Sequence, residues 1–223
     1  MIIDSDVEDI ENLKNRQIIF LNCHPEYWSH KMFFNLNETI KNKTNLIYLG
    51  GNGIWRKIIL KNDRVEKIGP QFCSKSGILN ASSNVLSIDE FAKNNKLTVE
   101  PYQILGMFYD ARGGSFPYCH FKCLEDHNIF NRVGIKKGEH FGIQNSGCGP
   151  SGHESDKINH KYLNQLTNDN IARPLLAKGL NKNADGGEIT IFKKYNSKVF
   201  SCGSIPFTRL SLIHISEPTR PID

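Results

Sequence analysis

Residues 16–53 read RQIIFLNCHPEYWSHKMFFNLNETIKNKTNLIYLGGNG, and the predicted fold begins from this stretch. Residues 16–22 are a short apolar run typical of a buried strand, and residues 45–49 are a second. Residues 29–41 between them predict a helix with Ser29 as its N-cap. The apolar positions at helical spacing are Met32, Phe33, Leu36 and Ile40. Because the crossover is short, we expect parallel, right-handed pairing of the two strands.

The rest of the chain predicts further strands joined by glycine-rich segments. Residues 54–60 and 64–68 are typical of a hairpin, as are residues 188–194 and 198–204 around a Tyr-Asn-Ser turn. The segment 104–130 is rich in glycine and aromatic residues, and we expect a long loop over a site. Further loops are expected over residues 70–84 and 141–152, and short helices over residues 87–94 and 162–166. The predicted architecture is a three-layer α/β domain with a Rossmann-like or glutamine-amidotransferase-like sheet and an antiparallel C-terminal hairpin.

Composition narrows the class of protein. The 223 residues carry a formal net charge of +5, without a dense block of Lys and Arg, so the sequence does not indicate a nucleic-acid partner. No apolar stretch approaches the length of a membrane-spanning helix, and the acidic N-terminus does not resemble a signal peptide. Six scattered cysteines without CxxC pairs predict reduced thiols. We therefore expect a cytoplasmic globular protein without a membrane partner.

Polar residues follow the first two predicted strands directly. His24, Pro25 and Glu26 follow the first, and Asn52 lies in the Gly-Gly-Asn-Gly run after the second. Loops at the carboxyl ends of strands are where open α/β sheets bind ligands. Glu26 has three interpretations: a metal ligand, a general base, or a carboxylate stabilised by a helix N-terminus. Asn52 has two compatible ones, a turn residue and an amide that binds a substrate carbonyl.

Two other segments carry chemically versatile residues. Residues 151–156, SGHESD, place a histidine and two carboxylates after a flexible turn, either as a site or as a helix cap. Cys23 is a candidate nucleophile of a cysteine hydrolase, although Asn22-Cys23-His24-Pro25 lacks the small residues of a nucleophile elbow. Cys119 and Cys123 form one Cys-x3-Cys pair, which without a second pair is poor evidence for zinc.

HPEYWS followed by YLGGNG resembles the C-terminal catalytic domain of the N,N-dimethylformamidase large (beta) subunit. Weaker similarities continue through residues 103–106, 151–156 and 186–205. The resemblance implies a hydrolase that acts on small, formamide-like amides through mononuclear iron bound by two tyrosines and one carboxylate. By position, Glu26 would be the iron ligand, Asn52 would orient the amide, and His24 and Glu154 would serve catalysis beside the metal. A small partner subunit and homo-oligomerisation would be consistent with this family.

Two features depart from the family pattern. Its tyrosine ligands precede HPEYWS, and none of the residues before His24 is a tyrosine. Residues 210–221, LSLIHISEPTRP, resemble a translated sequencing adapter of the kind found on metagenomic fragments. We therefore expect residues 1–209 to be an N-terminally truncated catalytic domain and residues 210–223 to be a non-native tail. Whether such a fragment is an active enzyme stays open. The alternative is a non-catalytic amidotransferase-like domain that binds a small molecule or sugar.

Overall fold

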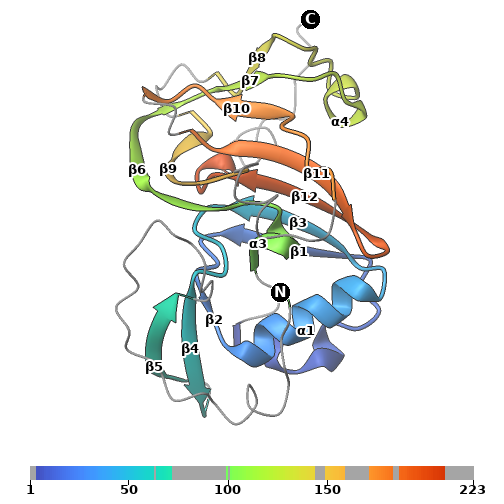
Figure 1. Ribbon diagram of the computed structural model, residues 1–223, viewed down its shortest axis with the longest axis vertical. Coiled ribbons are helices and arrows are strands. Elements are labelled where there is room, and N and C mark those ends of the chain that lie inside the picture. The colour runs from blue at the N-terminus through green and yellow to red at the C-terminus, as the bar shows by residue number, and fades with distance from the viewer. Residues whose placement is uncertain are drawn as a thin grey trace, which may run out of the picture.

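The computed structural model describes residues 4–62, 64–71, 99, 101–143, 149–158, 171–182 and 186–208. Within these residues the fold is mixed α/β, dominated by three open sheets with few helices (Figure 1). The largest sheet has seven strands in the order β1-β3-β12-β11-β10-β7-β8. The mixed α/β class is thus confirmed. The finer Rossmann-like or amidotransferase-like assignment stays a prediction.

The predicted strand–helix–strand unit is present. β1 (Ile18–Cys23) and β3 (Asn45–Gly50) pair in parallel, and α1 (His30–Lys41) connects them through the short strand β2 (Tyr27–Trp28). Ser29 is the N-cap, since its hydroxyl accepts a hydrogen bond from the Met32 backbone N–H. Local signals in the sequence were sufficient to predict β1, α1 and β3, whereas β2 was not predicted.

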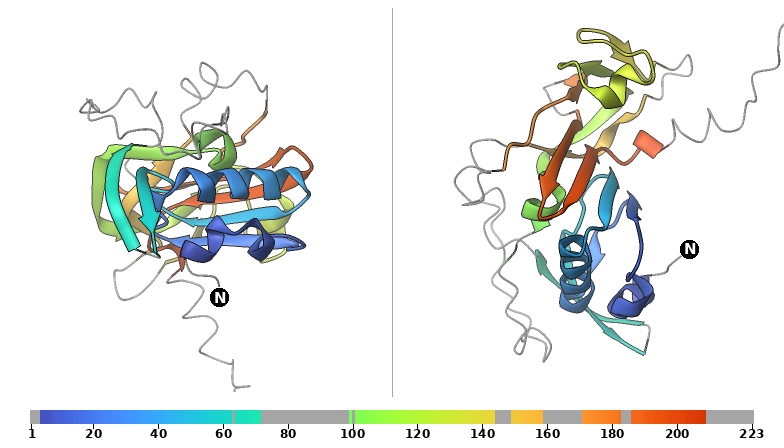
Figure 2. Two further views of the ribbon diagram at one scale, coloured as in Figure 1. Left: turned by 90° about the horizontal axis from the view of Figure 1, so that it is seen from below. Right: turned by 90° about the vertical axis from the view of Figure 1, so that its right-hand side faces the viewer.

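The central sheet changes from parallel to antiparallel beside β3. β12 (Ser197–Gly203) pairs in parallel with β3 and antiparallel with β11 (Glu188–Lys194). β10 (Ala177–Gly179), β7 (Phe121–Cys123) and β8 (His140–Phe141) continue the antiparallel part. Figure 2 shows α1 lying along the part of this sheet formed by β1 and β3. Three parallel strands therefore direct their carboxyl ends to one edge.

Two smaller sheets complete the described fold. β4 (Arg56–Lys61) and β5 (Arg64–Gln71) pair antiparallel, which confirms the hairpin predicted there, and β2 joins β4 in parallel. β6 (Phe108–Cys119) pairs antiparallel with β9 (Ser151–Lys157). This last pair places β9 against the carboxyl ends of the central strands.

The expected loop over residues 104–130 is wrong. The segment contains β6 and β7, preceded by α3 (Pro101–Leu105) and followed by α4 (Asn128–Asn131). Its aromatic residues favour strands, and β9 supplies the hydrogen-bonding partner. The register shifts between Tyr109 and Gly114, so the glycines fall at an irregularity in a strand instead of marking a loop.

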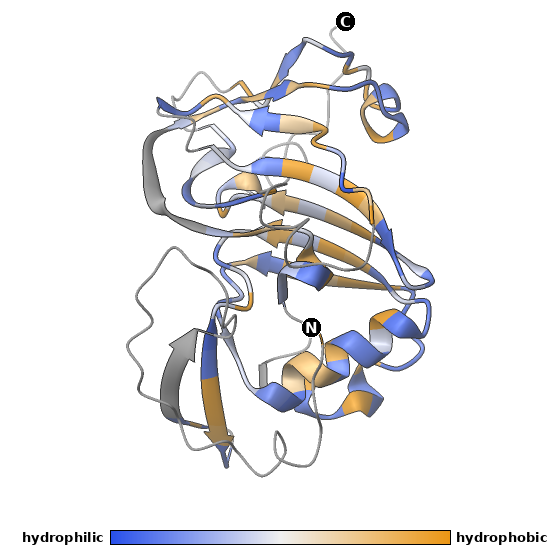
Figure 3. Cartoon of the chain, viewed as in Figure 1, coloured by the Kyte–Doolittle hydropathy of each residue, from blue (hydrophilic) through white to orange (hydrophobic). Residues whose placement is uncertain are grey.

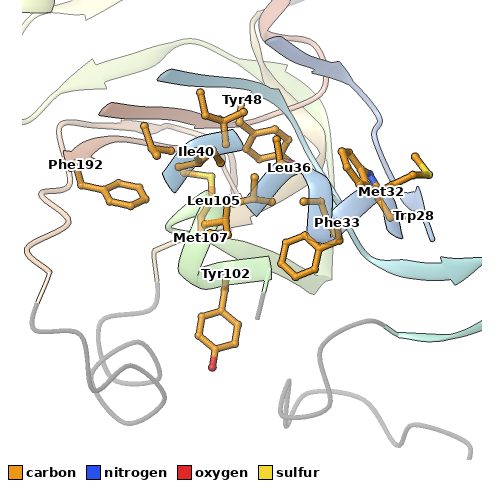
Figure 4. Packing of buried hydrophobic residues seen from close by; sticks show 14 of the residues in the cluster. Trp28, Met32, Phe33, Leu36, Ile40, Tyr48, Tyr102, Leu105, Met107 and Phe192 are labelled. Atoms are coloured by element: carbon orange, nitrogen blue, oxygen red, sulfur yellow. The ribbon is translucent and has the colours of Figure 1, made fainter. Parts of the chain in front are cut away.

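The main hydrophobic core lies between α1, the central sheet and α3. Met32, Phe33, Leu36 and Ile40 of α1 are all buried, as their spacing predicted. Figure 4 shows these side chains gathered with Tyr48, Leu105 and Met107. Figure 3 shows apolar stretches in the central strands β3, β11 and β12. A second cluster, centred on Phe121, packs beneath β7, β10 and α4. These two cores hold the strand ends that carry the candidate site.

Several expectations lie wholly or partly outside the described residues. The helices over residues 87–94 and 162–166 and the proposed tail over residues 210–223 are among them. Of the expected loop over residues 70–84, only residues 70–71 are described, as the end of β5. Cys23, Cys119, Cys123 and Cys202 are free thiols, in agreement with the prediction for those four. No helix within the described ranges is long and apolar enough to cross a membrane.

Candidate active site

The candidate site lies where the three parallel strands end. Cys23 of β1 and Gly203 of β12 both pair with Gly50, the last residue of β3. The chain leaving β1 therefore enters the same region as the Gly-Gly-Asn-Gly run leaving β3. This juxtaposition follows from parallel pairing, and it brings His24 and Asn52 together as the sequence suggested.

Two glycines allow β9 to approach this edge closely. A Cβ atom added at Gly51 would lie 2.0 Å from the carbonyl oxygen of Glu154. One added at Gly203 would lie 2.3 Å from the carbonyl oxygen of Asp156. Both distances are far shorter than a van der Waals contact, so only glycine fits at these positions. The glycines thereby place the carboxylates of β9 beside the strand ends.

His24 is the centre of a polar cluster. Its Nε2 lies 2.6 Å from Oε2 of Glu154 and 3.3 Å from Oε2 of Glu26. The Asn52 side-chain Nδ2 lies 3.2 Å from the same nitrogen and donates to Oε2 of Glu154 at 3.3 Å. Because two carboxylate oxygens face Nε2, we assign the imidazole proton to that nitrogen. All four residues predicted for the site thus lie within one hydrogen-bonded group.

Asn52 is held rigidly and keeps one polar atom unpaired. Its backbone has a left-handed φ of 57°, which asparagine tolerates, and its N–H donates to Oδ1 of Asp156 at 2.7 Å. The side-chain Oδ1 is buried and has no hydrogen-bond partner among the described residues. An unpaired buried acceptor costs about 1–3 kcal/mol, so a donor from a ligand or water would be stabilised here.

Four of the eight described non-glycine residues with left-handed backbone lie around the site. Besides Asn52, the non-glycine residues Cys23, Ile54 and His153 have φ values of 58°, 51° and 56°. Ile54 is the most unusual, because β-branched residues rarely adopt this conformation. Its N–H donates to the carbonyl of Pro25 at 2.8 Å, which ties the two loops together. Such strain is typical of functional sites, where surrounding contacts enforce it.

Glu26 is fixed by both its backbone and its side chain. Its carbonyl accepts hydrogen bonds from the N–H groups of Trp55 and Arg56, each at 2.9 Å. Its carboxylate is largely buried and lies 3.8 Å from Nε of Arg56, in addition to its contact with His24. The negative charge of Glu26, more than burial, raises the pKa of the neighbouring Tyr27 phenol.

Beneath the cluster lies a buried carboxylate. Asp156 is fully inaccessible to solvent and accepts hydrogen bonds from the Tyr48 hydroxyl at 2.6 Å and from Asn52 N–H. Burial raises the pKa of Asp156 to about 6, although these hydrogen bonds oppose the rise. Burial, followed by the charge of Asp156, raises the pKa of Tyr48 well above its ordinary value. Asp156 therefore holds the backbone of Asn52 in position.

The sequence did not assign roles to Tyr48, Asp156 or Arg56. Asp156 lies two residues after Glu154 on the same strand, so both side chains can face the site. Recognising residues 151–157 as a strand would have shown that Glu154 and Asp156 share a face. The helix cap considered for residues 151–156 is wrong, because the segment is the strand β9. Tyr48 and Arg56 carried no comparable signal, since one is an ordinary core position and the other an ordinary surface arginine in a strand.

A cavity of about 730 Å³ opens beside the cluster. It lies along β1 and the start of α1, and it reaches the site through His24, Pro25 and Tyr27. Its lining is mostly apolar and includes Ile18 and Phe20 of the exposed strand edge. Glu154 and Asn52 are not part of the lining. The cavity thus reaches the cluster only from the His24 side.

Comparison with protein families identifies the family of this chain. Residues 1–212 match the family described as N,N-dimethylformamidase beta subunit-like, C-terminal. The chain belongs to this family. The match covers every residue of the cluster, and it confirms the resemblance inferred from HPEYWS and GGNG. A search of curated proteins found no match.

The described part of this dimethylformamidase-like chain does not fit a complete iron site. No group of three or more His, Cys, Asp or Glu side chains within the described ranges could hold a metal ion. Glu26 is available as one carboxylate, but it is already paired with His24 and Arg56. Tyr48 donates its hydroxyl to Asp156. Two further donors would therefore have to come from elsewhere.

Cys23 lies close to the cluster without joining it. Its Sγ contacts Oγ1 of Thr208 at 3.8 Å, whereas the nearby imidazole of His24 faces Glu154. His24 is therefore not placed as the base for this thiol.

Proposed function

We propose that this chain carries part of the active site of an amide hydrolase of the dimethylformamidase type, acting on small, formamide-like amides. One observation supports this most directly: Glu154, His24 and the Asn52 amide meet at the end of parallel strands. Family membership gives the reaction class, and the cluster supplies the residue types that amide hydrolysis requires.

Each residue has a proposed role in the reaction. Glu154 accepts a proton from the attacking water, which then adds to the carbonyl carbon of the amide. The Asn52 side chain orients the amide, with its unpaired Oδ1 available to the N–H of a primary or secondary amide. His24 keeps Glu154 in position, donates its Nε2 proton to the amine nitrogen as the C–N bond breaks, and regains a proton from Glu154. The cavity beside His24 is the proposed route of entry.

The resemblance implies iron, and Glu26 would be its ligand in this chain. When bound, such an ion would polarise the amide carbonyl. Since the described residues do not make a complete site, the proposed steps use only the chain's own groups. The two tyrosine ligands would lie in sequence upstream of residue 1, and recovering the upstream gene tests this. The absence of two tyrosines at strand ends there would exclude the iron hypothesis.

We further propose that residues 1–209 form the catalytic domain and that residues 210–223 are not native. The family description, beta subunit-like, supports a partner subunit as well. The two assignments, residues 1–209 as the catalytic domain and residues 210–223 as not native, are tested by expressing the chain with its upstream sequence, with and without residues 210–223. Unchanged activity after removal of these residues would support the assignment.

Hydrolysis of formamide and its N-methyl derivatives by the chain with its upstream sequence tests the function. We expect Glu154→Gln to lower kcat about 10²–10⁴-fold, as for loss of a general base. Asn52→Ala should raise KM and lower kcat, and Glu26→Gln should also lower the iron content. Glu125→Gln, on the surface, and Cys23→Ala are the matched controls, expected to retain activity. Binding of formamide without turnover would instead support a non-catalytic domain, and loss of activity in Cys23→Ala alone would support the thiol mechanism.

A further inference from the structure

A second pair of reactive side chains lies far from the candidate site, at the β7–β8 end of the large sheet. Nε2 of His120 and Nδ1 of His140 are 3.1 Å apart, and their rings are tilted by 37° with centroids 4.9 Å apart. In the strand order, β12, β11 and β10 separate β3 from β7 (Figure 1). The proposed hydrolase mechanism uses neither histidine.

The backbone of both histidines is fixed by hydrogen bonds to neighbouring segments. His120 precedes β7, and its carbonyl accepts a hydrogen bond from Leu180 N–H at 3.0 Å. His140 belongs to β8, where it is paired with Lys122 of β7. On the neighbouring register position, Phe121 and Phe141 stack with centroids 5.5 Å apart, and Phe121 is fully buried. The pair is therefore presented by fixed strands, which lowers the cost of organising a ligand site.

The spacing of the two nitrogens suits a shared metal ion. Two cis ligands at about 2.0–2.1 Å from a metal are about 2.9 Å apart at a right angle and about 3.4 Å apart in a tetrahedron. The observed 3.1 Å lies between these values. We propose that His120 and His140 chelate one divalent transition-metal ion, with water completing its coordination. The ion would take the place of the hydrogen bond between the two ring nitrogens.

The surroundings predict which ion is preferred. Two neutral imidazole donors favour Cu²⁺ over Zn²⁺ in the usual order of affinities. Hard cations such as Mg²⁺ and Ca²⁺ prefer oxygen ligands and should not bind here. Lys122, opposite His140, adds positive charge to this face, so moderate affinity is expected. An ion at this position would link β8, the last strand of the sheet, to the β7 end of the core.

Calorimetric titration of the whole chain with Cu²⁺ or Zn²⁺, at neutral pH and without chelating buffer, tests the site. We expect one ion per chain at this site, Cu²⁺ bound more tightly than Zn²⁺, and affinity at least about tenfold weaker in His120→Ala or His140→Ala. The electron paramagnetic resonance spectrum of bound Cu²⁺ should show two nitrogen ligands in the wild type and one in each variant.

Two control variants separate this pair from other histidines. His127→Asn keeps a side-chain acceptor for the N-cap of α4 and should bind metal as the wild type does. His24→Ala removes the imidazole of the candidate active site and should also leave this binding unchanged. If the affinity falls in His24→Ala but not in His120→Ala or His140→Ala, the proposal is overturned. Should His120→Ala fail to fold, the exposed position His140, changed to Gln, gives the same test.

Discussion

The hydroxyl of Tyr48 donates a 2.6 Å hydrogen bond to Oδ2 of Asp156, joining β3 to a strand 108 residues later in the chain. Both side chains are fully buried. The other carboxylate oxygen of Asp156 accepts the backbone N–H of Asn52. This buried bridge therefore links the stability of the fold to the position of the Asn52 amide in the candidate site.

Replacing Tyr48 with phenylalanine tests the bridge. The variant leaves Oδ2 of Asp156 buried without its donor, so we expect the free energy of unfolding to fall by about 1–3 kcal/mol at pH 7. The loss should be smaller at pH 5, where protonation of Asp156 is favoured. Urea unfolding at both pH values measures this difference. An equal loss at both would mean that the contribution of this hydrogen bond does not depend on the ionisation of Asp156.

Asp156 should make stability depend on pH in the opposite sense to an ordinary ion-paired carboxylate. Its pKa is about 6 when folded, against 3.8 as the ordinary value, so the folded state binds the proton more tightly. Its contribution is therefore most favourable below pH 3.8, declines as pH rises to about 6, and is constant above that. The whole decline amounts to about 3 kcal/mol.

The variant Asp156→Asn removes this titration. From pH 4 to pH 7, the free energy of unfolding of the wild type should fall relative to that of Asp156→Asn. Asp126→Asn, at an exposed carboxylate, provides the control and should follow the wild-type curve. Parallel curves for wild type and Asp156→Asn across this range would show that Asp156 is already ionised in the folded protein at low pH.

Of the residues that meet in the candidate site, the sequence indicates those next to the first two strands more directly than those that come from distant segments. His24, Glu26 and Asn52 could be placed because each directly follows a strand whose apolar run is readable. Glu154 belonged to a candidate segment, residues 151–156, but only family resemblance joined it to His24, because it reaches the site through β9 and its pairing with β6. That pairing also explains why residues 104–130 were mistaken for a loop. Pairing between strands that are distant in the sequence cannot be predicted from the residues of either strand alone.

The positions of buried polar groups were also beyond local reasoning. Tyr48 occupies a core position in β3, and nothing in its neighbours indicates a carboxylate partner. Asp156 resembles any acidic residue in a polar stretch until β9 carries it to the sheet edge. The Gly-Gly-Asn-Gly run predicts a turn and a candidate substrate-binding amide, but not that its second glycine makes room for the β9 backbone. Such a requirement becomes visible only when both chain segments are present.

Gly51→Ala should therefore disturb the site more than an ordinary turn substitution. The added Cβ would lie 2.0 Å from the carbonyl oxygen of Glu154, so β9 must move and carry the Glu154 carboxylate away from His24. We expect a loss of about 2 kcal/mol or more in the free energy of unfolding, together with lower amide hydrolysis. Gly134→Ala is the matched control: its Cβ meets nothing within 4 Å, and only the left-handed φ of 74° is strained. Equal losses in both variants would argue against the close approach of β9.

The core that supports the strand ends can be tested with two phenylalanines. Phe33 of α1 is fully buried, whereas Phe20 of β1 is 60% exposed. Phe33→Ala should lower the free energy of unfolding by about 3–5 kcal/mol, because it removes a large buried side chain and leaves a cavity. Phe20→Ala should change it by less than about 0.5 kcal/mol, since most of that ring already contacts solvent. Urea unfolding of both variants measures the contrast. A large loss in Phe20→Ala would show that the exposed edge of β1 is covered in solution, for instance by a second copy of the chain. If a second copy covers this edge, the loss should depend on protein concentration.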